Sequence, residues 1–289
     1  MIERRRVVGG NGEKNYSKEY LTVKVKSGTP KIFCITTNVY YSTDGNSWNS
    51  LSSQGNIFNA NDIIFLKATY IDTNNRVRSL RIQNDGSVEL CGNPLSLVYS
   101  DSFTDYINSV PPVQAFYQLF EGSEGCEIDA SNLAMPEIMS EQCCMYMFSK
   151  CTGLVAPPNL PATTLATQCY SRMFQGCTGL TAAPELPATT MAITCYQYMF
   201  YGCTALTTAP VIPDATLANG CYQYMFQGCT SLNYIKYMGL TGPSSTYFNN
   251  WVLNVPRGGT FVKNSAASWT NSFGVSAIPS GWTVTTASS

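Results

Sequence analysis

Cysteine is the residue type whose number and spacing in this 289-residue chain first suggest chemistry. Twelve cysteines invite an interpretation as a disulfide framework or a metal site. No Cys-x-x-Cys pair occurs, however, and the spacings of 8 and 18 residues along Cys143, Cys151 and Cys169 do not match zinc ligands. A free cysteine behaves as a small apolar residue that is commonly buried. We therefore predict reduced cysteines packed in the core, with disulfides formed after export as the main alternative, and no metal or cofactor.

The absence of histidine restricts the catalytic chemistry further. It excludes Ser-His-Asp and Cys-His nucleophile systems and removes the usual general base near neutral pH. Carboxylates are the main remaining option, but segment 151–229 contains only three charged residues, Arg172, Glu185 and Asp214. No acidic pair recurs there that could serve as general acid and base in glycoside hydrolysis. We therefore predict that the protein is not an enzyme.

Tyrosine and threonine are the remaining candidates for a binding surface. Tyr198, Tyr201 and Tyr224 lie off the face that carries the recurring cysteine, methionine and phenylalanine residues. Tyrosine offers a large, stiff contact area with one polar group, which suits binding surfaces. We predict that these three tyrosines, with Thr181 and Thr207, bind a glycan or a protein through polar contacts and ring stacking. The alternative is that the tyrosines only pack the repeats.

A period of 26 residues governs the segment that carries these candidates. The step is clearest in four phenylalanines: Phe148, Phe174, Phe200 and Phe226. Cysteine, methionine, leucine and glycine positions follow the same step. A fixed period of this size indicates a solenoid, in which each repeat buries its apolar side against its neighbours. We expect 26-residue repeats over residues 143–240, a degenerate leader or capping repeat over 99–142, and a C-terminal cap over 241–289.

Each repeat predicts a short strand followed by a short helix. The strand begins at Leu180 and its equivalents and is ended by two prolines, because proline lacks the N–H that a ladder needs. The apolar residues from Cys195 to Cys203 fall at i, i+4, i+5 and i+8, which is one face of a helix. Gly202 then stands where a helix C-terminus favours a left-handed residue.

These repeats resemble the BspA-like leucine-rich repeats of surface proteins from gut and oral anaerobes and of their phages. The resemblance covers residues 143–232, with a degraded leader from about Phe120, and rests on motifs that recur in order: Cys177-x-x-Leu180, Leu186-Pro187, the anchor Met191, and Met199-Phe200-Tyr-Gly202-Cys203. Members of the family are mostly adhesins. The resemblance therefore implies a leucine-rich-repeat solenoid that recognises a host or surface ligand.

Residues 19–98 predict a β-sandwich-like domain of their own. Residues 20–26 alternate with period two, and turn signals separate further short strand candidates. Residues 1–18 predict a flexible basic arm, either solvated or ordered when it docks on a larger assembly. The whole chain is thus predicted to be mainly β with short helices.

The segment Ser42–Trp48 resembles the Asp-box hairpin, S-x-D-x-G-x-x-W, but is one residue short between Asp44 and Gly45. In the family that carries it, this box is a structural hairpin and not a catalytic element. We therefore favour a structural role for the segment, with a ligand site that involves Trp48 as the alternative.

Charge and targeting signals complete the prediction. A net charge of −1 gives no field to attract nucleic acid. The longest apolar run, Ile63–Leu66, is far too short to span a bilayer, so we predict no membrane insertion. The first residues lack the apolar stretch of a secretory signal, which predicts folding in the cytosol.

A phage particle reconciles an adhesin-type repeat with the lack of an export signal. We hypothesise a non-enzymatic virion-associated adhesin, as a tail-tip, fibre or head-decoration protein. Its N-terminal region would attach to other virion structural proteins, and its repeats would bind a host-surface glycan or protein; a homo-oligomer is left open. A bacterial cell-surface BspA-like adhesin is the alternative, and a polysaccharide-cleaving enzyme is the third hypothesis.

Overall fold

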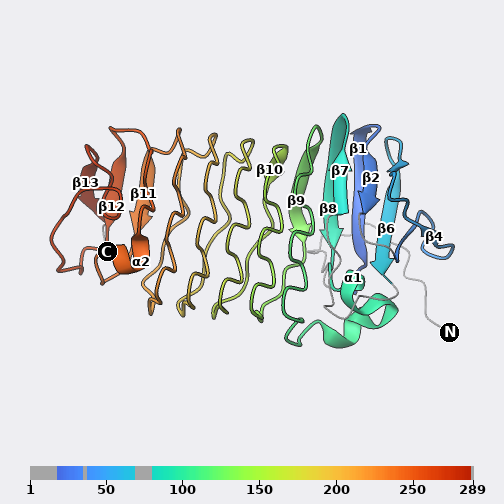
Figure 1. Cartoon of the computed structure of the whole chain (residues 1–289), viewed down its shortest axis with the longest axis horizontal. Coiled ribbons are helices and arrows are strands. Elements are labelled where there is room, and N and C mark those ends of the chain that lie inside the picture. The colour runs from blue at the N-terminus through green and yellow to red at the C-terminus, as the bar shows by residue number, and fades with distance from the viewer. Residues whose placement is uncertain (1–17, 35–37, 69–79, 288–289) are drawn as a thin grey trace.

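The computed structural model describes residues 18–34, 38–68 and 80–287, which form an elongated molecule (Figure 1). It is mainly β with a few short helices, which confirms the predicted class. The chain runs from an N-terminal sheet, through a row of repeats that lie side by side, to a small C-terminal sheet. The basic arm predicted over residues 1–18 lies outside the described residues, apart from Lys18.

The largest sheet has seven strands in the order β10-β9-β8-β1-β6-β3-β4. These strands are β1 (Leu21–Gly28), β3 (Val39–Ser42), β4 (Asn49–Ser50), β6 (Ile63–Ala68), β8 (Gly86–Gly92), β9 (Glu127–Leu133) and β10 (Leu154–Ala156). Strand β1 pairs antiparallel with β6 and β8, whereas β8 with β9 and β9 with β10 pair in parallel. The period-two pattern predicted for β1 is confirmed from Val23 to Lys26, where Val23 and Val25 are buried and Lys26 is exposed, whereas Thr22 before them is buried as well.

A second sheet, in the order β5-β2-β7, shares its core with the first. Its strands are β2 (Lys31–Cys34), β5 (Asn56–Ile57) and β7 (Leu80–Gln83). Ile32 and Ile82 of this sheet belong to the same hydrophobic cluster as Val23 and Leu90 of the first sheet. The cluster continues through the repeats to the C-terminal sheet, and the parallel pairing of β8, β9 and β10 crosses both predicted domain boundaries, at 98/99 and 142/143.

Two short helices connect the first sheet to the repeats. They are α1 (Ser96–Tyr99) and the 3-10 helix η2 (Ser100–Tyr106). The buried Ser96 hydroxyl accepts a hydrogen bond from the Leu21 N–H at 3.0 Å and donates one to the Leu66 carbonyl at 2.9 Å. Helix α1 is therefore fixed against β1 and β6, where the chain turns toward the repeats.

The repeats stack in register, so that equivalent residues form columns. The N–H groups of Phe148, Phe174 and Phe200 donate to the carbonyls of Met173, Met199 and Met225 at 2.9–3.0 Å, each one repeat further along. The phenylalanine rings stack on one another, with centroids 5.6–5.9 Å apart from Phe148 to Phe226. The strand part of each repeat is as brief as predicted, because between β10 and β11 (Tyr234–Tyr237) the described chain forms only isolated bridges such as Ala182 with Thr208.

The prediction of a short helix in each repeat is wrong. Residues 194–203 instead form consecutive turns, in which odd-numbered residues such as Met199 and Tyr201 donate to the carbonyl three residues earlier, at 3.1 Å. Even-numbered residues donate to the next repeat. Thr194, Tyr198 and Gly202 have φ of 50°, 57° and 70°, a conformation that no right-handed helix contains. Buried residues therefore recur every four residues and not every 3.6. Over the nine residues from Cys195 to Cys203, the two periods place apolar residues at the same positions, so the sequence pattern does not distinguish them.

The stack extends beyond the repeats that the sequence makes obvious. Gln114, Gln118 and Gly122 have φ of 60°, 57° and 72°, so the leader forms the same turns and begins before Phe120. At the other end, Asn250 and Asn254 have φ of 52° and 66° at the positions of Tyr224 and Gly228. Helix α2 (Ser245–Phe248) and a parallel sheet of β11, β12 (Thr260–Lys263) and β13 (Thr283–Thr286) close this end.

All twelve cysteines lie in the described residues, are buried and form no disulfide, and one column of them has a defined role. The thiols of Cys151, Cys177, Cys203 and Cys229 donate to phenylalanine carbonyls of the preceding repeat at 2.9–3.1 Å. Burial raises the pKa of Cys151 and of Cys229 to about 12, so these thiols remain protonated donors. The core position predicted for the cysteines is confirmed, and the thiol adds a bond between repeats.

Candidate functional site

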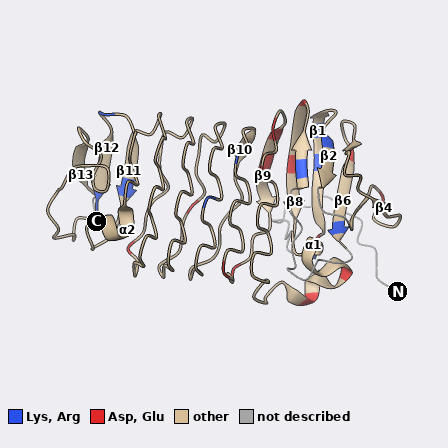
Figure 2. Ribbon diagram, in the orientation of Figure 1, with Lys and Arg blue, Asp and Glu red and all other residues tan. Residues whose placement is uncertain are grey.

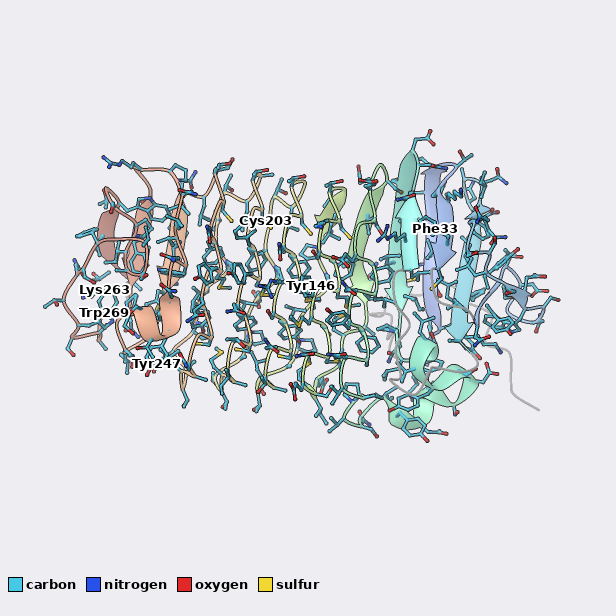
Figure 3. All side chains as sticks on the ribbon, in the orientation of Figure 1. Phe33, Tyr146, Cys203, Tyr247, Lys263 and Trp269 are labelled. Carbon is cyan, nitrogen blue, oxygen red and sulfur yellow. The ribbon has the colours of Figure 1, made fainter. Side chains whose placement is uncertain are left out.

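The turns of successive repeats present one continuous surface, which we call the turn face. In each unit two buried pairs, such as Cys195–Tyr196 and Met199–Phe200, alternate with two partly exposed pairs, such as Gln197–Tyr198 and Tyr201–Gly202. Tyr146, which is labelled in Figure 3, belongs to the second unit of turns, next to the leader. Because the repeats are in register, each exposed position forms a column across the face.

One of these columns is a ladder of stacked tyrosine and arginine side chains. It consists of Tyr146, Arg172, Tyr198 and Tyr224, one from each of four successive repeats, and we call it the tyrosine–arginine ladder. The Tyr198 and Tyr224 rings are parallel within 7°, with centroids 4.4 Å apart. The guanidinium carbon of Arg172 lies 4.4 Å from the Tyr198 centroid and 5.3 Å from the Tyr146 centroid. The sheet-like spacing of the repeats thus matches the distance at which flat side chains stack.

The structure brings together three of the predicted site residues. Tyr198 and Tyr224 are neighbours in the ladder, and the Tyr201 ring stands edge-on to Tyr198 at 5.7 Å. Thr181 and Thr207 are exposed as predicted, but they lie on the strand side of the repeat, beside the Ala182–Thr208 bridge. They are therefore not part of the ring contacts that join the three tyrosines.

The sequence reasoning missed Arg172 and Tyr146 as members of the site. The signal was present, because positions 146, 172, 198 and 224 are separated by the 26-residue step. The predicted binding mode also changes. Tyr198 lies between Arg172 of the preceding repeat and Tyr224 of the following one, so a sugar ring has no free face of Tyr198 on which to stack. Its hydroxyl and its ring edge are what a ligand meets.

The Tyr198 hydroxyl remains protonated near neutral pH. Burial and the neighbouring Tyr224 raise the pKa of Tyr198, and Arg172, which lowers it, does not reverse the direction. The Asn249 side-chain amide donates a hydrogen bond to the Tyr224 hydroxyl oxygen at 3.3 Å. The ladder therefore presents tyrosine hydroxyls and one guanidinium cation.

That cation has no acidic partner among the described residues. The ion pairs found there are Lys24–Glu89 and Lys26–Glu89 at 2.6 Å and Lys67–Asp101 at 2.9 Å, all in the N-terminal region. Figure 2 shows the same imbalance, with charged residues concentrated around the N-terminal sheet and sparse along the repeats. Arg172 is thus a charge held by aromatic rings on a nearly uncharged surface.

A depression of 520 Å³ lies at the N-terminal end of the turn face. Its charged lining residues are Arg81, Glu121, Glu124 and Lys150. Burial raises the pKa of Glu121, and the nearby Lys150 and Arg81 act in the opposite direction without cancelling the rise. Both signs of charge line this depression, whereas the ladder beside it carries a single positive charge.

Trp48 lies away from the repeats, in an aromatic group of the N-terminal region. Its ring is 5.4 Å from the Tyr20 ring, and the Lys67 ammonium lies 4.2 Å from its centroid. The hairpin before it is held by Asp44, which accepts hydrogen bonds from the Asn46 and Ser47 N–H groups at 2.8 and 2.7 Å. These bonds lower the pKa of Asp44 well below its usual range. The geometry favours the structural role of this hairpin.

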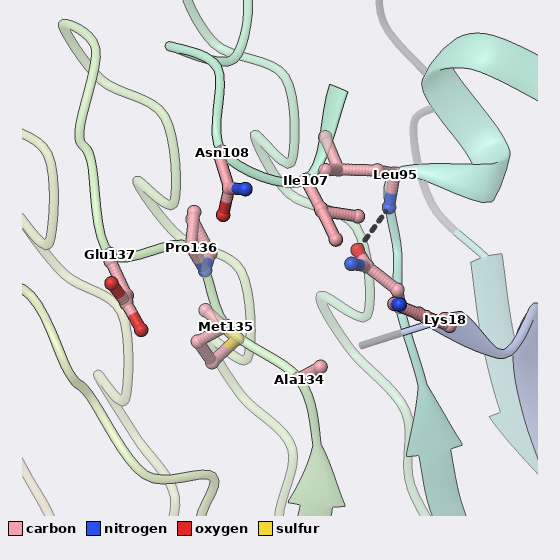
Figure 4. A pocket seen from close by; sticks show the side chains of 9 residues that line it. Lys18, Leu95, Ile107, Asn108, Ala134, Met135, Pro136 and Glu137 are labelled. Atoms are coloured by element: carbon pink, nitrogen blue, oxygen red, sulfur yellow. Dashed lines mark hydrogen bonds between the residues drawn. The ribbon is translucent and has the colours of Figure 1, made fainter. Parts of the chain in front are cut away.

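A second depression, of 320 Å³, lies between the first sheet and the repeats (Figure 4). Lys18 and Glu137 line it together with apolar side chains such as Ile107 and Met135. The Asn93 side chain accepts a hydrogen bond from the Leu95 N–H at 2.9 Å, which fixes one wall. Among the described residues that line it, Glu137 is the one carboxylate.

No cluster of three or more His, Cys, Asp or Glu side chains that could hold a metal ion occurs within residues 18–34, 38–68 and 80–287. In the same described ranges, no helix has the length and apolar character needed to cross a membrane. Compared with known proteins, the chain matches no family model, no curated protein and no solved structure.

Proposed function

We propose that this protein is a BspA-like leucine-rich-repeat solenoid that acts as a non-enzymatic, virion-associated adhesin. Its turn face binds a host-surface glycan or protein, and its N-terminal region attaches to other virion structural proteins in a tail tip, a fibre or a head decoration. The observation that carries the proposal is the tyrosine–arginine ladder, which runs along the exposed face of four repeats.

The in-register stack supports the solenoid assignment. Each repeat donates backbone hydrogen bonds to the next, and phenylalanine, tyrosine and cysteine columns fill the interior. A single repeat leaves its apolar side open, so stability comes from the interfaces between neighbours. The leucine column, which includes Leu180 and Leu206, is fully buried, as the resemblance to leucine-rich repeats implies.

The rigidity of the ladder supports a role in binding. Stacked rings have few accessible rotamers left, so a ligand that meets them loses little additional side-chain entropy. Tyrosine hydroxyls and the guanidinium provide directional hydrogen bonds at the repeat spacing. Packing alone does not require a partly exposed cation between two rings.

The position of the two acidic residues in segment 151–229 supports a non-enzymatic role for the repeats. Glycoside hydrolysis needs two carboxyl groups on either side of the bond that is cleaved. Glu185 and Asp214 lie in the loops between strands and turns, and the Asp214 carboxylate accepts a hydrogen bond from the Leu240 N–H at 2.9 Å. Between Glu185 and Asp214 in sequence, the turn face carries tyrosine, glutamine and glycine.

The thiol column supports folding in a reducing compartment. Four cysteine S–H groups donate to carbonyls across the stack, which requires the reduced state. Disulfides are rare in the cytosol, where virion proteins fold before release. A bacterial cell-surface adhesin folds after export, in a more oxidising environment, so the same observation favours the virion over that alternative.

Binding to intact cells of the source host tests the proposal. The test variant combines Tyr198→Gln with Tyr224→Asn. Glutamine and asparagine occur naturally at this turn position, as Gln118 and Asn250, so we expect the variant to keep the fold. We expect this variant to lose at least about tenfold in affinity. The matched control, Thr181→Val with Thr207→Val, introduces the residue found at Val155 and should bind as the unmodified protein does.

Equal binding by the two double variants would reject the turn face as the ligand site. Virion attachment has its own test, since mass spectrometry of purified particles from the source should detect the chain. Its absence from particles, together with its presence on bacterial envelopes, would replace the virion hypothesis with the cell-surface alternative.

A further inference from the structure

The Arg172 guanidinium is the most unusual group on the turn face. It is partly exposed and lies between the Tyr146 and Tyr198 rings, with its carbon 5.3 and 4.4 Å from their centroids. Rings on both sides restrict the Arg172 side chain to few rotamers, and a guanidinium carries its N–H donors in a planar fork. A planar fork of this kind matches the two oxygens of a carboxylate.

The hydrogen-bond capacity left on the ladder is mainly that of a donor. A guanidinium donates and never accepts. The Tyr224 hydroxyl oxygen already accepts from Asn249, so its proton is available to a ligand. None of the ion pairs of the described residues includes Arg172. A ligand that satisfies these groups must supply acceptor oxygens and negative charge.

We infer that the ligand of the turn face is an acidic polysaccharide, with a carboxylate on Arg172 and neighbouring sugar hydroxyls on the tyrosine hydroxyls. The inference rests on the proposed function and specifies its ligand class. The two half-buried glutamines beside the ladder, Gln197 and Gln223, hydrogen-bond to each other at 3.2 Å and add neutral polar groups suited to sugar hydroxyls.

The charge pattern favours a polysaccharide over a nucleic acid. Binding along a phosphate backbone uses several cations in a row, because each contact neutralises one phosphate. The ladder offers one cation in four repeats, and the residues at its other three positions are tyrosines. An acidic polysaccharide carries neutral hydroxyls beside its carboxylates, so it can meet the tyrosines as well as the single cation.

The inference is tested by calorimetry with the full chain and three probes: an oligogalacturonide, the same oligomer as its methyl ester, and dextran sulfate. The ester keeps the sugar shape but removes the charge. We expect the free acid to bind at least about tenfold more tightly than the ester, because a charge-assisted hydrogen bond contributes more than a neutral one. Arg172→Gln, which places the residue of Gln118 at this position, should abolish that difference.

Lys236→Gln is the matched control, since it removes one positive charge from strand β11 and leaves the turn face intact. It should keep the preference for the free acid. Equal binding of acid and ester, binding of dextran sulfate alone, or an unchanged preference in Arg172→Gln would each overturn the inference. Tighter binding of a single-stranded oligonucleotide than of the oligogalacturonide would overturn it as well. None of these results would by itself reject the proposed function, which the host-cell binding assay tests separately.

Discussion

In the N-terminal sheet, Glu89 accepts hydrogen bonds from Lys24 and Lys26, each at 2.6 Å, so unlike side chains pair across neighbouring strands. In the stack of repeats, like side chains contact like. Phe174 stacks on Phe200 at 5.6 Å, and Tyr196 stacks on Tyr222 at 5.9 Å. Both regions belong to one hydrophobic cluster, yet each uses a different means to fix the position of its strands.

The two regions differ in how far the structural effect of a substitution spreads. A charged pair involves two or three residues whose partners are unique to that place. A column residue in the stack contacts its own copies in the preceding and following repeats, so each copy depends on two neighbours. We therefore expect substitutions in the columns to disturb adjacent repeats, and substitutions in the N-terminal sheet to act within that sheet.

Phe200→Ala should have the largest effect on stability. The side chain is fully buried and lies between Phe174 and Phe226, with centroids 5.6 and 5.7 Å away. Its removal leaves a cavity in the column, and we expect the free energy of unfolding to fall by about 3–5 kcal/mol. Urea denaturation followed by tryptophan fluorescence measures this change.

Phe58→Ala is the control in the N-terminal region, because it removes the same side chain from a buried position where it contacts the Tyr41 ring edge-on at 5.3 Å. Hydrogen exchange should show reduced protection in the repeats on either side of Phe200 in the first variant only. If Phe58→Ala reduced protection in those repeats as strongly, the contrast between the two regions would fail.

Glu89→Gln should have the second largest effect. Burial raises the pKa of Glu89, but the hydrogen bonds from Lys24 and Lys26 lower it more, to about 2, from an ordinary value of 4.5. The folded state therefore favours the charged form, and its contribution is complete above pH 4.5 and is lost as the pH falls toward 2. We expect a loss of about 2 kcal/mol at pH 7, since two charge-assisted bonds are weakened.

The pH dependence separates this effect from a simple packing defect. Unfolding free energies measured between pH 5 and pH 2 should fall less steeply in Glu89→Gln than in the unmodified protein. Asp101→Asn is the exposed counterpart, since the Asp101 side chain is 62% exposed and pairs with Lys67. We expect it to cost less than about 1 kcal/mol. Equal pH profiles for Glu89→Gln and the unmodified protein would contradict the role given to this pair.

The contrast between the regions also explains how much of the fold the sequence predicted. Identical residues at a 26-residue step revealed the columns of the stack, because like residues contact like. The parallel pairing of β8 with β9 was not predicted, since Val88 and its partner Ile128 are far apart in sequence and no repeat connects them. The turns were mistaken for a helix because a four-residue period and a 3.6-residue period give the same pattern over Cys195–Cys203.

The site was predicted in part for the same reason. Tyr198 and Tyr224 were found by their residue type, whereas Arg172 was read only as one of three isolated charges. Its place in the ladder depends on the register between repeats, which puts an arginine and three tyrosines in one column. Residue type alone does not show that Tyr198 is covered on both faces, and that fact decides which of its atoms a ligand meets.

Tyr196→Phe should have the smallest effect and is the finest test of the columns. Tyr170, Tyr196 and Tyr222 stack in the core, and no protein group in the described structure hydrogen-bonds to the Tyr196 hydroxyl, although the residue is buried. Burial raises the pKa of Tyr196 well above its ordinary value, so the hydroxyl stays neutral. A buried hydroxyl without a partner costs desolvation energy. Its removal should therefore be neutral or stabilise by up to about 1 kcal/mol.

The fold itself supplies a precedent for this change, because Phe248 occupies the same column and stacks on Tyr222 with centroids 4.9 Å apart. Tyr237→Phe is the matched control, since the Tyr237 side chain is equally buried but its hydroxyl donates to the Thr241 carbonyl. That variant should lose about 1 kcal/mol. If urea denaturation showed an equal loss for both variants, the Tyr196 hydroxyl would have a partner within the core, and the tyrosine column would contribute hydrogen bonds as well as stacking.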